Sequence, residues 1–379
     1  MKRCVGRLVF LLLLASGCSH TAVAPSAASV EPAVATPVLG AEPSVAGARW
    51  IVTTGALPFA AGEFPASEGQ GAAELVVLAD QARHALTGFG GAFNEQGWSA
   101  LSVLSESERQ AVLAALFDPR TGLALSYGRI PIGASDYALD RYTLDEAPGD
   151  YEMARFSIDR DRRQLIPFIR AALKLRPDLR LWASAWTPPT WMKTNGAFDG
   201  GNFRDEPKMY AAYALYLARF VESYRAEGID VSMVVPQNEP GQITRYPSCG
   251  WTPAQYVTFI RDHLGPTLKR RSLSTQIFAG TINQADWDIL SVLKEPGAAS
   301  FIDGAALQWH AIKQLAPVRQ AFPNLTIMQS ETECGNNHWE PDYNPRRAPN
   351  DFAYAAYTFR KLRDFIAGGA SSYMLWNLV

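Results

Sequence analysis

The feature that most constrains the fold is a regular alternation of short apolar runs with amphipathic stretches after residue 80. Eight runs have the length and composition of β-strands, at residues 86–93, 123–131, 180–186, 231–238, 275–281, 303–309, 325–330 and 371–377. The stretches between them are predicted as helices, at 99–117, 159–175, 205–227, 253–269, 286–295, 313–321 and 351–367, with Asp159 and Thr252 as predicted N-caps. This alternation predicts an α/β fold, a (β/α)8 TIM barrel.

A doubly wound parallel sheet is the alternative to the barrel. It is disfavoured because no glycine-rich phosphate loop opens a helix after the first strand. The 379 residues are 47% hydrophobic, which allows one large barrel, and the net charge of −2 gives no support to nucleic-acid binding.

Cysteine and histidine spacing gives only weak support to a metal site, since no cluster has ligand spacing. Cys249 and Cys334 each follow a strand end. Outside the cytoplasm they could form a disulfide, and two free buried thiols are the slightly favoured alternative.

The N-terminus is predicted to be a targeting signal. Basic residues at positions 2, 3 and 7 flank the start of an apolar run, Leu8–Leu14, which is too short to span a bilayer. Ala15–Cys18 follows and resembles a bacterial lipobox, so residues 1–18 are interpreted as a lipoprotein signal peptide with a lipid anchor at Cys18. A plain signal peptide, cut near Ala22 or Ala24, is the alternative. Either interpretation predicts an exported protein, anchored to the cell envelope or secreted.

Two further segments precede the barrel. Residues 19–48 are rich in Ala, Pro, Ser and Val and carry almost no charge, which is typical of a flexible tether. Residues 49–85 contain short extended runs, Trp50–Thr54 and Leu75–Leu78, and are predicted as an N-terminal β-segment. The barrel is assigned to residues 86–379. Because the sequence stops at Val379, directly after the eighth strand, we expect a truncated fragment without the last helix.

Two acidic residues at strand ends point to the chemistry. Each lies at the end of an apolar run: Glu239 sits in the stretch Val234–Pro240, and Glu331 in the stretch Leu325–Glu331. A TIM barrel carries its active site at the C-terminal ends of its strands. Two carboxyl groups brought together there can hydrolyse a glycoside, one as acid and the other as nucleophile. Glu333 is the runner-up nucleophile.

Six stretches carry a resemblance to a known family. They are TGFGGAF (87–93), GRIPIG (128–133) with Asp136, WASAWTPPTWMKTNG (182–196), QNEP (237–240), SE (330–331) and WNL (376–378). In this order and spacing they resemble glycoside hydrolase family 30, especially its glucosylceramidase branch. The resemblance implies a retaining β-glycosidase without a cofactor, and a companion β-sandwich built from both chain ends, of which this chain holds only the N-terminal strands.

The same resemblance implies roles for individual residues. Glu239 matches the acid/base, Glu331 the nucleophile, and Asn238 the neighbour that contacts the sugar 2-hydroxyl. Glu95 stands where the family's glucosidases are expected to have an aspartate that binds sugar hydroxyls. Trp186 and Trp376 match tryptophans that line the sugar site.

Three assignments stay open from the sequence. The chain departs from the glucosylceramidase pattern at Gln308-Trp309-His310, and His310 could contact substrate or pack at the rim. Asp136 could contact substrate or cap its loop. Arg129 could donate to the nucleophile or form a structural salt bridge.

The predicted function is hydrolysis of β-glucosides, either of glucosylceramide type or β-1,6-glucan, by double displacement. The predicted partner is a β-linked glycoside or oligosaccharide, with membrane contact only through Cys18 and a monomeric state. A carbohydrate-binding lipoprotein with impaired catalysis is the second class, and a metal-dependent hydrolase the third. The sequence leaves open glucose against xylose specificity, and exo against endo action.

Overall fold

The computed structural model describes residues 47–54, 56–57, 60–65, 81, 84–333, 335–338, 340–341, 343–348 and 351–379. The chain divides into two compact units, one of residues 1–75 with 334–360 and one of residues 76–333 with 361–379. The predicted signal peptide, Cys18, Cys334 and the run Leu75–Leu78 lie outside the described residues, as does the tether up to residue 46.

The first unit contains an antiparallel pair of strands, β1 (Gly47–Val52) and β2 (Ala60–Pro65). Gly47 lies opposite Pro65, and Val52 lies opposite Ala60. The predicted β-segment at the N-terminus is therefore confirmed as a small sheet, although the strand that pairs with β1 lies at 60–65, where no strand was predicted. The last two residues assigned to the tether, 47 and 48, belong to β1.

The second unit is a closed barrel of eight parallel strands in the order β10-β3-β4-β5-β6-β7-β8-β9. The strands are β3 (Gly88–Ala92), β4 (Tyr127–Ile132), β5 (Arg180–Ala185), β6 (Val231–Val235), β7 (Gln276–Ile282), β8 (Ile302–Gln308), β9 (Thr326–Glu331) and β10 (Ser372–Leu375). β10 pairs with both β3 and β9, which closes the sheet and excludes the doubly wound alternative. The predicted TIM barrel is confirmed.

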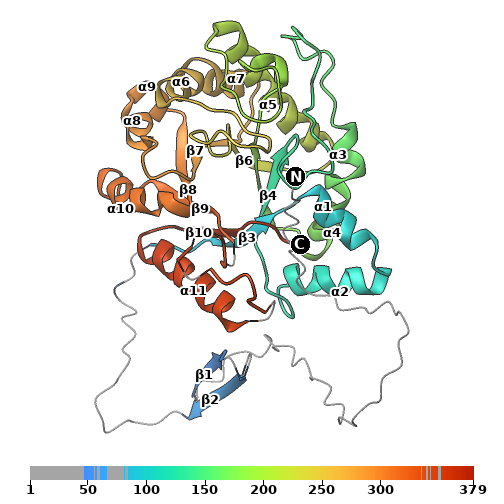
Figure 1. Ribbon diagram of the computed structural model, residues 1–379, viewed down its shortest axis with the longest axis vertical. Helices are drawn as coiled ribbons and strands as arrows, with labels where there is room; N and C mark the ends of the chain where they lie inside the picture. The colour runs from blue at the N-terminus through green and yellow to red at the C-terminus, as the bar shows by residue number, and fades with distance from the viewer. Residues whose placement is uncertain are drawn as a thin grey trace. The chain divides into compact units, whose positions relative to one another are not determined.

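Helices follow the strands and lie outside the ring of strands in Figure 1. They are α1 (Glu95–Ser102), α2 (Glu106–Phe117), α3 (Asp159–Arg163), α4 (Leu165–Leu175), α5 (Pro207–Ala226), α6 (Pro253–Thr258), α7 (Gly265–Arg270), α8 (Ile289–Lys294), α9 (Pro296–Ala299), α10 (Ile312–Ala321) and α11 (Phe352–Ala367). Short turns of other helix types are η1 (Thr190–Met192), η2 (Phe259–Leu264) and η3 (Trp309–Ala311).

Local hydrogen bonding explains where the helices differ from the prediction. The stretch 99–117 is two helices, because Ser105 starts α2 with a capping box to Glu108. Thr252 is confirmed as an N-cap, with a capping box to Gln255. The prediction for Asp159 was wrong. It is the first residue of α3, and the Ser157 hydroxyl accepts a hydrogen bond from its backbone N–H at 3.1 Å.

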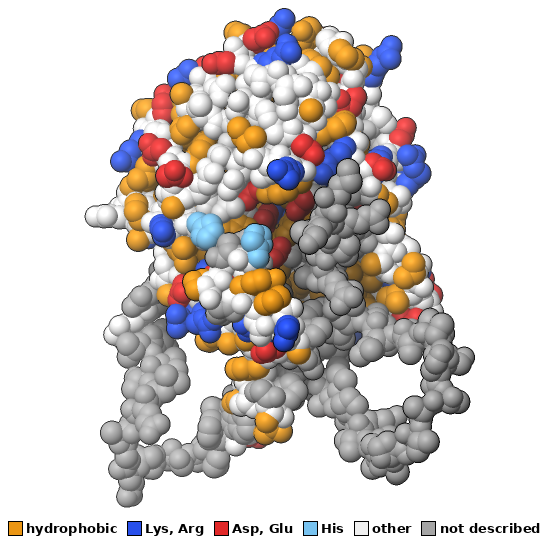
Figure 2. Space-filling view, viewed as in Figure 1, with side chains coloured by type: hydrophobic (Ala, Val, Ile, Leu, Met, Phe, Trp, Pro, Cys, Tyr) orange, Lys and Arg blue, Asp and Glu red, His pale blue; other side chains and the backbone are white. Residues whose placement is uncertain are grey.

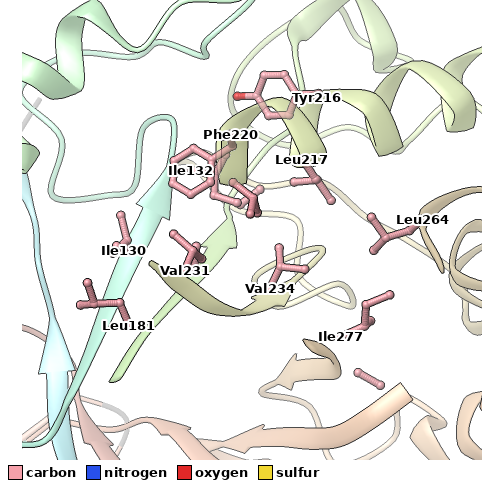
Figure 3. Packing of buried hydrophobic residues seen from close by; sticks show 14 of the residues in the cluster. Ile130, Ile132, Leu181, Tyr216, Leu217, Phe220, Val231, Val234, Leu264 and Ile277 are labelled. Carbon is pink, nitrogen blue, oxygen red and sulfur yellow. The ribbon is translucent and has the colours of Figure 1, made fainter. Parts of the chain in front are cut away.

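The barrel strands bury side chains on both faces. One cluster, inside the barrel, consists of Tyr127, Trp182, Met233, Val235, Phe278, Ala306, Met328 and Met374. A larger cluster includes strand residues such as Leu181 and Val234 together with helix residues such as Leu217 and Phe220 (Figure 3). Because side chains alternate along a strand, Arg129 shares the face of Tyr127, and Ser184 that of Trp182. Both therefore project inward near the C-terminal strand ends.

The surface gives few further clues to binding. On the face shown in Figure 2, acidic and basic side chains are interspersed. None of the helices in the described ranges combines the length and apolar character that crossing a bilayer requires.

Candidate active site

Glu331 and Glu239 both lie at the C-terminal rim of the barrel. Glu331 is the last residue of β9. The strand predicted to reach residue 238 ends at Val235, just before Pro236, whose nitrogen cannot extend the hydrogen-bonded ladder. Glu239 therefore lies in the loop after β6, not at the strand end itself. Both residues are buried, at 5% and 6% exposure for Glu239 and Glu331.

The backbone at Glu239 is held in an uncommon conformation. Its φ is +47°, in the left-handed region, which raises the conformational energy of a residue with a Cβ by roughly 1–2 kcal/mol. Its N–H donates to the Thr281 carbonyl at 3.0 Å, and its carbonyl accepts from the Gln242 N–H at 2.8 Å. Strain of this kind persists where surrounding bonds over-determine the geometry, and it clusters at functional sites.

Glu331 receives its hydrogen bonds from a cation and an indole. The Arg129 Nη1 donates to Oε2, and Trp309 Nε1 donates to Oε1 at 3.0 Å. Of the two alternatives left open for Arg129, the structure shows an ion pair with Glu331, and the guanidinium stabilises negative charge on that carboxylate. Burial lowers the pKa of Arg129, but the charges of Glu331, Glu239 and Asp136 oppose this shift, and arginine stays protonated in proteins.

Arg129 is itself fixed on all sides. Its Nε donates to Ser184 Oγ at 3.0 Å and its Nη2 to Asn238 Oδ1 at 2.6 Å. The guanidinium carbon lies 4.3 Å from the ring centroid of Trp186 and 5.5 Å from that of Trp376. Bonds to three partners and stacking on aromatic rings leave the guanidinium little freedom, so its position is set before any ligand binds.

Glu239 receives its hydrogen bonds from neutral donors. The Tyr246 hydroxyl donates to Oε2 at 2.8 Å, and Asn283 Nδ2 donates to Oε1 at 2.6 Å. Burial, followed by the negative charge of Glu331, raises the pKa of Glu239 to about 7, although the bonds from Tyr246 and Asn283 act to lower it. A carboxyl group with this pKa can hold a proton near neutral pH and then release it.

Asn238 precedes Glu239 in the chain and is bonded to the guanidinium that binds Glu331. Its Oδ1 accepts from Arg129, which donates to Glu331, and from Thr281 Oγ1 at 2.8 Å. The structure therefore brings Glu239, Glu331 and Asn238 together, as the sequence predicts.

Aromatic side chains line the same region. Trp186 and Trp376 lie with ring centroids 5.2 Å apart, and the ring of Tyr137 meets Trp376 edge-on at 5.6 Å. Trp186, Trp376 and Ala92 form one buried cluster, with Tyr137 and Tyr246 packed against it. Both predicted tryptophans thus lie beside Arg129 and the acid pair, although their predicted contact with sugar stays a prediction.

Two more carboxyl groups have pKa values raised by the charges of the acid pair. Burial and the charges of Glu331 and Glu239 raise the pKa of Asp136 to about 8. Its Oδ1 is buried and has no hydrogen-bond partner within the described part of the chain. Burial and the charge of Glu331 raise the pKa of Glu333 to about 7. Glu331, not Glu333, receives the Arg129 and Trp309 bonds and acts on the pKa of Glu239.

Glu95 and His310 are not joined to this network. Both carboxylate oxygens of Glu95 are bonded to Arg160, and one also accepts from the Leu139 N–H at 2.7 Å. Its predicted contact with sugar hydroxyls stays untested, but its oxygens are already occupied. His310 lies in η3 with an exposed side chain, so its predicted substrate contact also stays a prediction.

The site offers no evident metal position. Across the ranges that the structure describes, no group of three or more His, Cys, Asp and Glu side chains could hold an ion. The acid pair instead lies among hydrogen-bond donors and aromatic rings. Cys249, in the loop after β6, is a buried free thiol, and Cys334 lies outside the described residues.

Comparison with known proteins decides the family. Residues 86–377 match the model of the glycosyl hydrolase family 30 TIM-barrel domain. The chain belongs to glycosyl hydrolase family 30. The match begins just before β3 and ends just after β10, so it covers the whole barrel and both acids.

Curated relatives are similar over the same region. Lysosomal acid glucosylceramidase of Mus musculus is 32% identical over 273 residues, which are 67% of this chain and 52% of the mouse protein. The endo-1,6-beta-D-glucanase BGN16.3 of Trichoderma harzianum is 29% identical over 277 residues, 68% of this chain and 54% of the fungal enzyme. The chain therefore spans about half the length of these relatives.

Solved structures agree with the family. SrfJ from Salmonella typhimurium has a TM-score of 0.77 at 26% identity, with 87% of this chain and 74% of that chain covered. The endo-beta1,6-glucanase BT3312 has a TM-score of 0.69 at 26% identity, with 78% and 66% covered.

Within this family 30 barrel, three partners of the acids were missed by sequence reasoning. Asn283 and Trp309 are the first residues after β7 and β8, so the strand-end rule that found the acids could have found them too. Tyr246 lies in the irregular loop after β6, and no sequence signal singles it out.

Proposed function

We propose that this chain is a retaining β-glycosidase in which Glu331 is the nucleophile and Glu239 the acid/base. One contrast supports the assignment: Glu331 is bonded to a guanidinium, whereas Glu239 is bonded to neutral donors and has a pKa of about 7. Two neighbouring carboxyl groups with such different surroundings can divide the roles of charged nucleophile and protonated acid between them.

The proposed reaction has two displacements at one carbon. In the first, the Glu331 carboxylate attacks the anomeric carbon while Glu239 gives its proton to the departing glycosidic oxygen. In the second, the Glu239 carboxylate takes a proton from water, the water oxygen attacks the same carbon, and Glu331 is released. We expect the two carboxyl groups at the retaining separation of about 5–5.5 Å.

The surroundings of the pair suit a sugar ring. Trp186 and Trp376 offer aromatic faces, and we assign Asn238 to the sugar 2-hydroxyl because its Oδ1 shares the Arg129 guanidinium with Glu331. Asp136 Oδ1 and Asn283 Oδ1 are buried without hydrogen-bond partners among the described residues, and buried polar atoms are normally paired. We therefore assign both atoms to sugar hydroxyls.

The proposed substrates are β-glucosides. The relatives named above are a glucosylceramidase and endo-β-1,6-glucanases, so glucosylceramide-type lipids and β-1,6-glucan are the two candidate classes. We also propose that the protein is exported, carries a lipid anchor at Cys18, and acts as a monomer. Replacing Cys18 with Ala should release it from the membrane fraction, whereas unchanged fractionation would favour the plain signal peptide.

The decisive test is hydrolysis of an aryl β-glucoside followed by proton NMR. We expect β-glucose as the first product, before it equilibrates with the α form. An α-glucose first product would contradict the double displacement. Binding without release would favour the catalytically impaired carbohydrate-binding protein, and loss of activity to a chelator would favour the metal-dependent hydrolase.

A further inference from the structure

The segment 135–142, which follows β4, carries two side chains to the acid pair and has no strand or helix of its own. Asp136 Oδ1 is buried and has no hydrogen-bond partner among the described residues, and burial with the charges of Glu331 and Glu239 raises the pKa of this carboxyl. Tyr137 packs edge-on against Trp376. An irregular segment owes its conformation to the bonds that hold it, since no regular ladder does so. The groups that fasten this segment therefore decide where Asp136 and Tyr137 lie.

The start of α1 fastens the segment at three successive residues. The Gln96 N–H donates to the Tyr137 carbonyl at 3.2 Å, and the Gln96 side-chain amide donates to the Ala138 carbonyl at 3.4 Å. The third bond runs from the Leu139 N–H to Glu95 Oε2 at 2.7 Å. It is the shortest of the three and the one with a charged acceptor, which makes it the strongest.

Arg160, from α3, fixes Glu95 in turn. Its Nε and Nη2 donate to the two oxygens of Glu95, each at 2.8 Å, which is a bidentate pair. The same guanidinium donates to Asp140 Oδ2 at 3.3 Å and lies 4.2 Å from the ring centroid of Tyr142. Arg160 thus contacts the segment directly at two residues and holds the carboxylate that binds a third.

The ion pair between Glu95 and Arg160 is expected to contribute little to the stability of the fold. Glu95 is only 2% exposed, and burying an ion pair gives little net stability over apolar packing of the same volume. What a bidentate pair does provide is orientation, because the planar fork allows only one arrangement of the two groups.

We propose that Glu95 and Arg160 form a positioning clamp for the segment 135–142, and through it set Asp136 and Tyr137 against the sugar. This inference rests on the proposed function for the part that concerns substrate. Glu95 is thereby a positioning residue, not a ligand of the sugar. The prediction from the sequence found an important glutamate but gave it a different role.

Kinetics of Glu95→Gln on an aryl β-glucoside test the clamp. The amide keeps the shape of the side chain but loses the ion pair with Arg160. We expect KM to rise roughly tenfold with a smaller change in kcat, since a displaced binding group weakens substrate binding before it affects the bond-breaking step. The matched control is Glu222→Gln on α5, which breaks a bidentate pair with Arg271 after α7 and should leave KM unchanged.

A double-mutant cycle separates the clamp from a merely structural role. If Glu95 acts through Asp136, then Asp136→Asn should cost less in kcat/KM in the Glu95→Gln background than in the wild-type protein. Additive losses, or an unchanged KM in Glu95→Gln while the wild type is active, would overturn the inference and leave the proposed function standing.

Hydrogen–deuterium exchange tests the clamp without relying on activity. Glu95→Gln should speed exchange in the peptide that covers 135–142, most of all at the Leu139 amide, and Glu222→Gln should not. If exchange there is unchanged, the clamp is wrong. If exchange rises but the wild type hydrolyses no β-glycoside, the clamp stands and the proposed function fails.

Discussion

The end of β9 and the loop after β6 each carry a glutamate at the same rim of the barrel. The two glutamates receive their hydrogen bonds from different kinds of donor. Glu331, at the end of β9, is bonded to Arg129 and Trp309. Glu239, in the loop after β6, is bonded to Tyr246 and Asn283. Both are buried, so exposure does not distinguish them. The difference lies in the donors, and the proposed division of chemical roles rests on this environment, because the residue type is the same.

The two regions also act on each other. A charged Glu331 disfavours a second negative charge nearby, and this repulsion adds to burial in raising the pKa of Glu239 to about 7. Arg129 offsets the charge on Glu331 but donates no hydrogen bond to Glu239. The arrangement therefore raises the pKa of Glu239 while Arg129 offers a positive charge to Glu331, as the proposed first step requires.

The largest expected effect is the loss of turnover when Glu331, at the end of β9, is replaced. Glu331→Gln should lower kcat by roughly 10⁴-fold or more on every substrate, because no covalent intermediate can form. Steady-state assays with an aryl β-glucoside would measure it, with thermal melting to check the fold. Glu333→Gln is the matched control, since it removes a raised-pKa carboxyl two residues away. If the Glu333 variant proves inactive and the Glu331 variant active, the nucleophile is Glu333.

The next largest effect is expected on turnover when Glu239, in the loop after β6, is replaced. Glu239→Ala should lower kcat by roughly 10²–10⁴-fold on substrates with poor leaving groups, which need a proton. Aryl glucosides with good leaving groups should still form the glycosyl-enzyme. Azide should then restore turnover and give a β-glucosyl azide, measurable by NMR. An α-azide, or no rescue in a folded variant, would contradict the contrast between the two acids.

A smaller effect is expected on the pH dependence of kcat/KM, which reports the pKa of Glu239. In the wild type, kcat/KM should fall as pH rises through about 7, because Glu239 loses the proton it must donate. Tyr246→Phe removes a bond that lowers this pKa, so the alkaline limb should move upward by roughly half to one unit. Tyr210→Phe, whose hydroxyl bonds to Asp205, should not move it. A downward shift would show that Tyr246 stabilises the protonated form.

The smallest effect is on stability. The pKa of Glu239 is about 7 in the folded protein, above its ordinary value of 4.5, so between these pH values the folded state binds more protons than the unfolded state. Stability contributed by this group is full below 4.5 and is lost as pH rises toward 7. Glu239→Gln removes this pH-dependent contribution, because the amide does not titrate. Its melting temperature relative to wild type should therefore rise across this window, by the equivalent of roughly 1–3 kcal/mol. A difference independent of pH would contradict the raised pKa.

Much of the fold could be predicted because its signals are local. Each strand of the barrel is a short apolar run, and the alternation with amphipathic helices fixes the (β/α)8 count. Boundaries were less predictable. Val235 ends β6 before the residue that looked like its end, and the capping box at Ser105 divides one predicted helix into two. These depend on single hydrogen bonds that a hydrophobic pattern does not contain.

The candidate site divides in the same way. Glu331, at the end of β9, and Asn238 and Glu239, in the loop that follows β6, could be found because they belong to compact motifs. Tyr246 could not, since it reaches Glu239 from an irregular loop. Glu95 was marked by a sequence motif, but its partner was not. Its bond to Arg160 joins positions 65 residues apart, so only the folded structure reveals it.

The sequence by itself determined the barrel, the family and the two acids, because hydrophobic periodicity and short motifs are properties of neighbouring residues. Only the tertiary structure decided which donors each acid receives, that the charges of the pair raise the pKa of Asp136, and that Glu95 binds Arg160. The physical reason is that charge, burial and hydrogen bonding act over a few ångströms in space. Closure of the barrel brings Arg129 to Glu331 across 202 positions of the chain, a distance that no local pattern encodes.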